Sequence, residues 1–221
     1  MMTEFEGLVR AFREGVDAAY TAASSWALGS FACIDVANAV WIAGAGHEGI
    51  PRHVDLLRDG SAYAKLLAAR TLGNLAWRDH ANKVLIAEAG GIPPLVDLLR
   101  GGSAEAKLSA AVALRILAYN AANKVLIAEA GGIPPLVDLL RGGSAEAKDE
   151  AVRALANLAF IAASRVLIAE AGGIPPLVAA SHVLIAEAGG IPPLVDLLRD
   201  GSADAASSAA WALHYIAYNN D

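Results

Sequence analysis

The sequence is poor in the residues from which most catalytic and metal sites are built. Its 221 residues include one cysteine, Cys33, and five histidines. A single thiol excludes an internal disulfide and fits a reducing compartment. No histidine has a second ligand at a spacing typical of zinc sites, so we expect neither a metal nor another cofactor. The glycine pairs precede prolines rather than forming a phosphate-binding loop. We therefore predict that the protein is not an enzyme.

Long apolar runs and basic clusters are also missing. Hydrophobic residues make up 56% of the chain, but glycine, proline and charged residues interrupt every run before the roughly 20 residues of a membrane-spanning helix. The formal net charge is −6, whereas nucleic-acid binding needs concentrated positive charge. The first residues lack the apolar core of a signal peptide. We expect no membrane or nucleic-acid partner. We expect a cytoplasmic location or, as the alternative, a location in both the cytoplasm and the nucleus.

What the sequence has instead is internal repetition. The stretch from Asn82 to Arg100 returns unchanged from Asn123 to Arg141. Its core, Val-Leu-Ile-Ala-Glu-Ala-Gly-Gly-Ile-Pro-Pro-Leu-Val, appears again at Val166–Val178 and at Val183–Val195, and a looser copy lies at 40–58. A period of about 40 residues is typical of a helical solenoid. We therefore predict an all-α fold with one elongated core.

Glycine and proline divide each complete repeat into three helices. A short helix at Asn82–Ala89 ends at Gly90-Gly91, because glycine adopts the left-handed conformation at a helix end without a steric penalty. Pro93-Pro94 opens the second helix, where a missing N–H costs nothing. Ser103 caps the third and longest helix, predicted at Ser103–Tyr119, whose apolar residues recur at helical spacing.

We predict one domain, residues 1–221, equivalent to about five stacked three-helix repeats and divided into six segments, because the first repeat is partial and another is truncated. These are a partial N-terminal repeat at 1–38, repeats at 39–80, 81–121 and 122–163, a truncated repeat at 164–181, and a C-terminal repeat at 182–221. About 24 residues are missing after Val178 relative to the other copies. We expect Pro175–Ala188 to form one fused helix in place of the lost third helix. Exchange of the C-terminal segment between two chains is the alternative.

Charged residues recur at fixed places in the repeats. The second helices carry an aspartate and an arginine three residues apart, which predicts surface ion pairs of a few tenths of a kcal/mol. These pairs are Asp97 with Arg100, Asp138 with Arg141, and Asp196 with Arg199. Lys65, Lys107 and Lys148 open the third helices at positions turned roughly 140° from those that face a groove, so we predict that they form a solvated edge.

The repeated motif resembles the armadillo repeat. The resemblance rests on Glu-Ala-Gly-Gly-Ile-Pro-Pro-Leu-Val-Asp-Leu-Leu, followed by Gly-Ser and a helix such as Ala-Arg-Thr-Leu-Gly-Asn-Leu-Ala at 69–76, and it extends over nearly the whole chain. It implies a right-handed superhelix of three-helix units, as in importin-α and β-catenin. In such proteins the third helices line a concave groove that binds extended peptides.

The resemblance also implies which residues line the groove. Importin-like members present a tryptophan and, four residues later, an asparagine on one face of each third helix; the asparagine holds the peptide backbone and the tryptophan holds basic side chains. The matching pairs here are Trp26 with Ser30, Arg70 with Asn74, Val112 with Ile116, Arg153 with Asn157, and Trp211 with Tyr215. Tryptophan and asparagine never share a pair, and Arg70 and Arg153 repel basic peptides. We therefore expect an acidic or neutral extended peptide or protein segment as the partner.

Two functions stay open. The first is a non-enzymatic peptide- or protein-binding scaffold. The second is an engineered or recently duplicated structural array without a dedicated ligand, in which Asn74 and Asn157 bond neighbouring turns. The identity of 81–107 with 122–148 favours the second, and the divergence of the third helices favours the first. The last helix, Ala203–Tyr218, has no polar cap after it, so we also expect a homo-oligomer formed through Trp211, Leu213 and Ile216.

Overall fold

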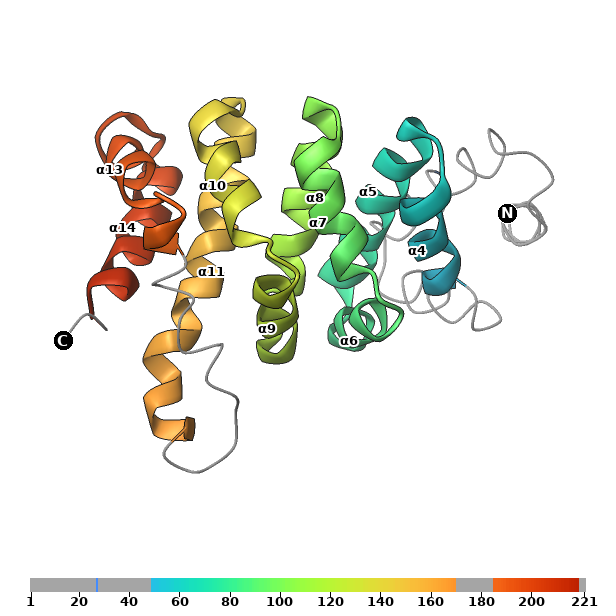
Figure 1. Ribbon diagram of the computed structural model, residues 1–221, viewed down its shortest axis with the longest axis horizontal. Helices are drawn as coiled ribbons and strands as arrows, with labels where there is room; N and C mark the ends of the chain where they lie inside the picture. Colours follow the sequence, from blue (N-terminus) through green and yellow to red (C-terminus); the bar gives the residue numbers. More distant parts are fainter. Residues whose placement is uncertain (1–26, 28–48, 170–184, 219–221) are drawn as a thin grey trace.

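The computed structural model describes residues 27, 49–169 and 185–218. Every regular element in these residues is a helix, and the helices stack side by side along one axis (Figure 1). The helices are α4 (Gly49–Asp59), α5 (Ala62–Arg78), α6 (His80–Glu88), α7 (Ile92–Gly101), α8 (Ala104–Leu117), α9 (Ala121–Glu129), α10 (Ile133–Gly142), α11 (Ala145–Ala169), α13 (Ile191–Asp200) and α14 (Ala203–Tyr218). The predicted all-α solenoid is confirmed.

Helices α6–α8 form one complete three-helix unit, and its boundaries follow the predicted glycine, proline and serine signals. Gly90 has a φ of 74° and ends α6, prolines occupy the first turn of α7, and Ser103 Oγ accepts a hydrogen bond from the backbone N–H of Ala106 at 3.3 Å. The start of α6 differs from the prediction. The Asp79 carboxylate caps it by accepting from the N–H of Ala81 at 3.0 Å, so the helix begins two residues before Asn82.

Helix α11 crosses a boundary that the sequence predicts at 163/164. It combines a third helix with the start of the next copy in one run of 25 residues. The side chain of Asn120, which caps α9 in the preceding unit, corresponds to Ile161, which has no oxygen to offer. Without a cap at this point, the helix continues. The predicted fused helix at 175–188 lies almost entirely outside the described residues; its last part is helical to Glu187 and then turns at Gly189.

The core runs between the third helices, which pack in the order α5, α8, α11 and α14. Leu72, Leu114 and Leu155 occupy equivalent places in three of them and are fully buried. Small residues let the helix backbones approach closely: a Cβ on Gly73 would lie 3.5 Å from the Cα of Ala113. No helix in the described ranges is long and apolar enough to cross a membrane.

An arginine at the end of each interior second helix reaches the following unit. Arg100 Nη2 donates hydrogen bonds to the carbonyl oxygens of Ala130 at 3.0 Å and Gly131 at 3.1 Å. Its Nη1 forms the predicted ion pair with Asp97 at 2.9 Å. Arg58 and Arg141 repeat this arrangement at Ala89 and Gly90, and at Ala188 and Gly189. These carbonyls lie at the C-terminal end of a helix, where a cation is favourable. The arginines therefore link units, beyond their predicted role in surface pairs.

Arg100→Ala is expected to lower the free energy of unfolding by about 1–2 kcal/mol, because it removes two hydrogen bonds from a charged donor at an exposed site. Arg199→Ala is the matched control. Arg199 ends the second helix of the last unit and pairs with Asp196 and Asp200 of its own helix. Its removal is expected to change stability by less than about 0.5 kcal/mol. Urea unfolding measures both losses, and equal losses would contradict the inter-unit role.

Candidate peptide-binding groove

The predicted groove positions lie along the third helices, but not all of them are accessible. Arg70 is exposed on α5 and Asn74 is half-buried beside it. Val112 packs against the core from α8, and Ile116 is only 4% exposed. We therefore correct this pair: two apolar side chains on the inner side of α8 contribute to the core rather than to a binding surface.

The C-terminal half of the predicted groove comes together as one recess. Arg153 and Asn157 of α11 and Trp211 of α14 lie around a cavity of about 470 Å³. The same cavity is lined by Arg115, Tyr119, Ala156, Asp204, Ser207 and Ser208. Trp211 is 57% exposed, so its indole offers an apolar surface at the edge of a polar recess. Trp26 and Ser30, and the side chain of Tyr215, lie outside the described parts of the chain.

Ion pairs cross from one third helix to the next on this face. Arg153 Nη2 lies 3.2 Å from Asp204 Oδ2, and Arg115 Nε donates to Glu150 Oε2. The Arg115 guanidinium also lies over the ring of Trp77, 5.8 Å from its centroid, which is cation–π distance. The Arg115–Glu150 pair is largely buried, whereas Asp204 is 83% exposed. Arg115 is therefore held in place by a buried partner, whereas Arg153 pairs with a carboxylate that is exposed to solvent.

Asn157 has a structural role in addition to its place in the recess. Its side-chain Nδ2 donates a hydrogen bond to the backbone oxygen of Arg115 at 3.2 Å, which joins α11 to α8. This is the alternative role expected for the groove asparagines. An amide NH2 group has two N–H donors, so a peptide backbone at this site would bond the second while the first joins the two helices.

A series of exposed aromatic residues was not predicted from the sequence. Trp77 on α5 and Tyr119, two residues after the end of α8, occupy the same place in their repeats, three residues after the asparagine position, and are 57% and 56% exposed. Phe160 and Tyr218 stand at the corresponding places of α11 and α14, although their side chains lie outside the described parts. Alignment of the third helices on one another, rather than on the importin pattern, would have revealed this series.

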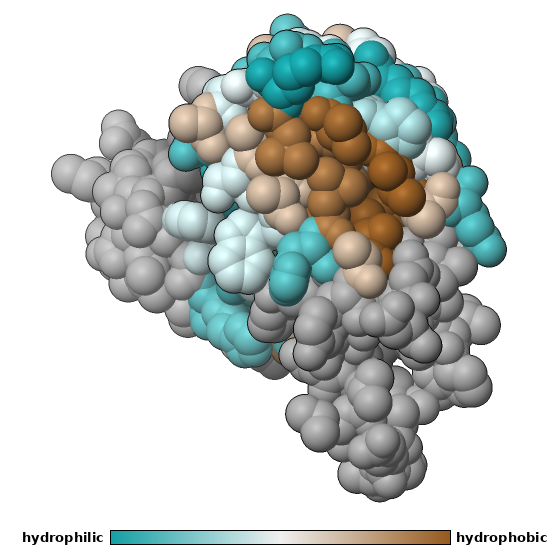
Figure 2. All heavy atoms as spheres, turned by 90° about the vertical axis from the view of Figure 1, so that its left-hand side faces the viewer, coloured by the Kyte–Doolittle hydropathy of each residue, from teal (hydrophilic) through white to brown (hydrophobic). Residues whose placement is uncertain are grey.

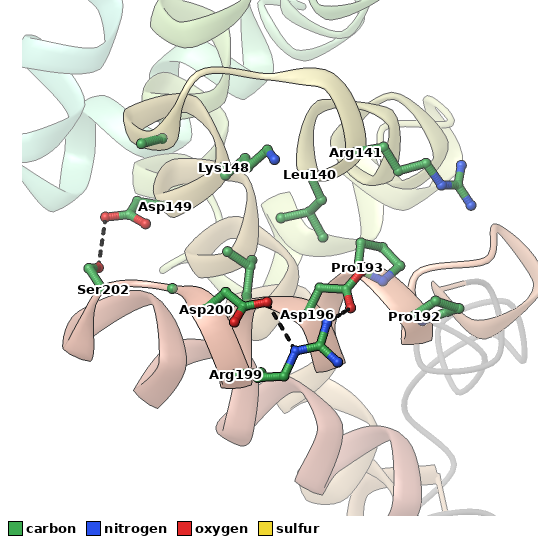
Figure 3. A pocket seen from close by; sticks show the side chains of 13 residues that line it. Leu140, Arg141, Lys148, Asp149, Pro192, Pro193, Asp196, Arg199, Asp200 and Ser202 are labelled. Carbon is green, nitrogen blue, oxygen red and sulfur yellow. Dashed lines mark hydrogen bonds and ion pairs between the residues drawn. The ribbon is translucent and has the colours of Figure 1, made fainter.

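The recurring lysines lie at different recesses, away from the groove. Lys148 lines a cavity of about 760 Å³ between α10, α11 and α13, together with Pro192, Pro193 and Arg199 (Figure 3). Lys65 and Lys107 line the equivalent cavities of the preceding units. The three lysines are half-buried there, so the predicted edge is less solvated than expected, but it is separate from the groove. Among the described residues, no group of histidine, cysteine and carboxylate side chains could hold a metal ion.

The repeated three-helix unit matches a known protein family. A model described as Armadillo/beta-catenin-like repeat matches residues 79–119, 120–160 and 183–218, which together make more than half of the chain. The chain belongs to the armadillo repeat family. The first two armadillo matches begin at Asp79 and Asn120, the residues whose side chains cap α6 and α9. The third begins at 183 and passes over the copy at Val166–Val178.

Solved structures similar to this armadillo array include engineered proteins. A designed armadillo repeat protein is 28% identical, with a TM-score of 0.80 over 97% of this chain and 83% of that chain. Another, solved in complex with the peptide (KR)4, is 28% identical, with a TM-score of 0.76 over 96% of this chain and 81% of that one. A structure described as an engineered protein is 30% identical, with a TM-score of 0.78 over 96% and 79% of the two chains. No curated protein sequence matches the chain.

Proposed function

We propose that this armadillo array binds an extended peptide or protein segment along the exposed face of its third helices. The observation that carries the proposal is the recess between α8, α11 and α14, where Trp211 and Tyr119 stand beside Arg153 around one cavity. Exposed aromatic side chains supply contact area at low entropic cost, and arginines orient a polar ligand. The designed armadillo relative that was solved in complex with the peptide (KR)4 supports peptide binding as a function of this fold.

The charges of this face favour an acidic or neutral ligand. The charged residues that line the recess are two arginines, Arg115 and Arg153, and one carboxylate, Asp204. Arg115 is engaged with the largely buried Glu150, but Asp204 is exposed and its pair with Arg153 is weak. A ligand carboxylate can therefore replace Asp204 at Arg153 at little cost, while its apolar side chains lie on Trp211. A lysine or arginine of a ligand would meet the guanidinium of Arg153 instead.

Three labelled peptides of equal length test the proposal: one acidic, one neutral and one basic, with the same leucine and tyrosine positions. Fluorescence anisotropy is expected to show tighter binding of the acidic and neutral peptides. Arg153→Glu is expected to reverse the order of the acidic and basic peptides by about tenfold, since one charged contact is worth roughly 1.4 kcal/mol. Trp211→Ala is expected to weaken all peptides that bind by about fivefold or more.

Lys107→Glu is the matched control for this experiment. It changes the net charge of the protein as much as Arg153→Glu does, but Lys107 lines a recess away from the groove. It is expected to leave the order of the three peptides unchanged. An equal shift from both substitutions would mean that the overall charge, and not the groove, determines binding. Tightest binding of the basic peptide to the unmodified protein would contradict the proposed charge preference.

The second candidate is an engineered or duplicated array whose role is structural. It is supported by the identity of residues 81–107 and 122–148 and by the designed origin of the similar structures. The groove itself adds an argument, because Arg115 and Arg153 already have carboxylate partners and Asn157 already has an acceptor. In this case none of the three peptides binds, and a protein with both Asn74→Ala and Asn157→Ala differs from the parent in stability alone.

The unit boundaries and the compartment are part of the same proposal. We propose a single domain with repeats at 39–80, 81–121 and 122–163, a partial repeat before them, a truncated repeat at 164–181 and a final repeat at 182–221. The armadillo fold serves as a binding scaffold, and we propose that this one acts without catalysis or cofactor in the cytoplasm, or also in the nucleus. We propose self-association as well. Of the three residues predicted for it, Trp211 is exposed, Leu213 packs partly against the core, and Ile216 is 3% exposed.

A further inference from the structure

An apolar patch covers the C-terminal end of the stack, which faces the viewer in Figure 2. Ile191, Val195 and Leu198 form one stripe along α13 and are 39%, 45% and 43% exposed. The same positions in α10 are Ile133, Val137 and Leu140, which are 1%, 0% and 2% exposed. Both helices carry the sequence Ile-Pro-Pro-Leu-Val-Asp-Leu-Leu-Arg. The stripe is therefore the surface that interior units bury against the unit that follows.

The interior junctions define what this surface binds. At each junction the valine of a second helix meets the second glycine of the following copy: a Cβ on Gly132 would lie 3.3 Å from Val96 Cγ2, and a Cβ on Gly190 would lie 3.2 Å from Val137 Cγ2. The arginine at the end of the same helix bonds the two carbonyls before that glycine. The complementary segment is thus the short helix and glycine pair of Val-Leu-Ile-Ala-Glu-Ala-Gly-Gly.

The chain contains one more of these segments than its interior junctions use. The second glycines of three copies, Gly91, Gly132 and Gly190, lie against Val54 of α4, Val96 of α7 and Val137 of α10. The remaining copy is Val166–Gly173. The second helix ahead of it, α10, is already covered by 183–190. Among the second helices that the structure describes, α13 is therefore left with an uncovered surface, and Val166–Gly173 is the copy of this segment that no described junction uses.

We propose that Val166–Gly173 of a second copy of this chain docks on the exposed stripe of α13, and that two copies exchange this contact to form a symmetric dimer. The chain's own copy is poorly placed, because residues 166–169 form the last turn of α11, which projects below the stack in Figure 1, whereas α13 lies at the top. Reciprocal exchange buries both stripes and closes the assembly. The surface lies outside the third-helix groove, so the inference does not depend on the proposed peptide binding.

In this dimer the contacts of the interior junctions recur between chains. Val195 packs against Gly173 of the other copy as Val137 packs against Gly190. Arg199, which is held by Asp196 and Asp200 of its own helix (Figure 3), donates to the carbonyls of the other copy's Ala171 and Gly172. These are the counterparts of Ala130 and Gly131, which accept from Arg100.

Two variants test the α13 stripe and the docking segment Val166–Gly173 separately. Val195→Asp places a charge in the stripe and is expected to give a monomer. Deletion of residues 166–182 removes the additional copy and joins Arg165 to Val183. The last copy then follows Val125 by 41 residues, the spacing that separates Val84 from Val125. This variant is also expected to be monomeric. Leu126→Asp is the control, because Leu126 is 41% exposed on α9 and far from the stripe. Light scattering from about 1 to about 100 μM covers the dissociation constants expected of a modest interface.

Mixing the two variants completes the test. The deletion variant keeps the exposed stripe, and the Val195→Asp variant keeps the additional segment, so the mixture is expected to form a one-to-one complex although each variant alone is monomeric. Circular dichroism confirms that each is folded. A monomeric parent protein over the whole concentration range would overturn the proposal. So would a deletion variant that still dimerises, since the stripe would then bind something other than Val166–Gly173.

Discussion

Acidification from pH 7 to pH 4 is expected to lower the free energy of unfolding by about 3 kcal/mol through one side chain, His53. This histidine is fully buried in α4, and its Nδ1 lies 2.6 Å from the carbonyl oxygen of Gly49. Burial lowers the pKa of His53 from 6.5 to about 4, and the hydrogen bond to Gly49 opposes the shift only in part. The imidazole is therefore neutral in the folded protein at neutral pH.

The sign of the effect follows from proton uptake. Between pH 6.5 and about 4 the unfolded chain binds a proton at His53 and the folded chain does not. Stability is therefore unaffected by this group above about pH 7, falls as the pH drops through 6.5, and stops falling near pH 4. Urea unfolding at several pH values measures the slope.

His53→Leu is expected to flatten the pH dependence relative to the parent, because it removes the group that takes up the proton on unfolding. His214→Leu is the matched control, since His214 is an exposed histidine on α14, and it is expected to leave the difference between pH 7 and pH 4 in place. If His53→Leu loses as much stability on acidification as the parent does, other groups, and not this imidazole, are responsible for the acid sensitivity.

The helix boundaries show which local signals can be read from a sequence. Glycine, proline and serine act on the backbone within one turn, so Gly90, Pro93 and Ser103 predict the ends and starts of helices correctly. The repeat does not reveal the capping role of Asp79 and Asn120, because these two residues differ in type and precede the stretch that is identical in both copies. Asn123, the counterpart of Asn82, is instead buried and donates to the carbonyl of Lys83 in the preceding unit at 2.9 Å.

The candidate groove was less predictable, because side chains on one helix face have partners on the next helix. The repeat positions grouped Arg153, Asn157 and Trp211 together, and the structure has all three in the lining of one recess. It did not indicate that Arg153 pairs with Asp204, which follows it by 51 residues. It also assigned Ile116 to the groove, although that side chain turns into the core. Contacts of this kind depend on how neighbouring helices stack, and the sequence of a single repeat does not show that stacking.

The inter-unit arginines show the same limit. The spacing of Asp97 and Arg100 predicts an ion pair within one helix, and that pair forms at 2.9 Å. The hydrogen bonds from Arg100 to the next unit need the end of α9 to lie beside the end of α7. Only the stacked structure shows this arrangement. In it, Gly131 has a second role beyond its backbone conformation, because its carbonyl oxygen accepts a hydrogen bond from Arg100.

Gly131→Ala is expected to lower the free energy of unfolding by about 2–3 kcal/mol. Gly131 has a φ of 70°, where a side chain costs roughly 1–2 kcal/mol. A Cβ at this position would also lie 2.9 Å from Arg100 Nη2. The guanidinium would have to move, and the hydrogen bonds to the carbonyls of Ala130 and Gly131 would be weakened, for about 1 kcal/mol more.

Gly142→Ala and a double-mutant cycle make this prediction specific. Gly142 ends α10, and a Cβ there would meet no atom within 4 Å, so alanine is expected to stabilise the protein by about 0.5–1 kcal/mol. In an Arg100→Ala background, Gly131→Ala is expected to cost only the backbone part, about 1–2 kcal/mol, because the guanidinium is gone. Urea unfolding of the four proteins of the cycle gives the coupling. If Gly131→Ala costs the same with and without Arg100, the role of Gly131 is restricted to its left-handed backbone. If Gly131→Ala leaves stability unchanged, neither the backbone strain nor the contact with Arg100 contributes.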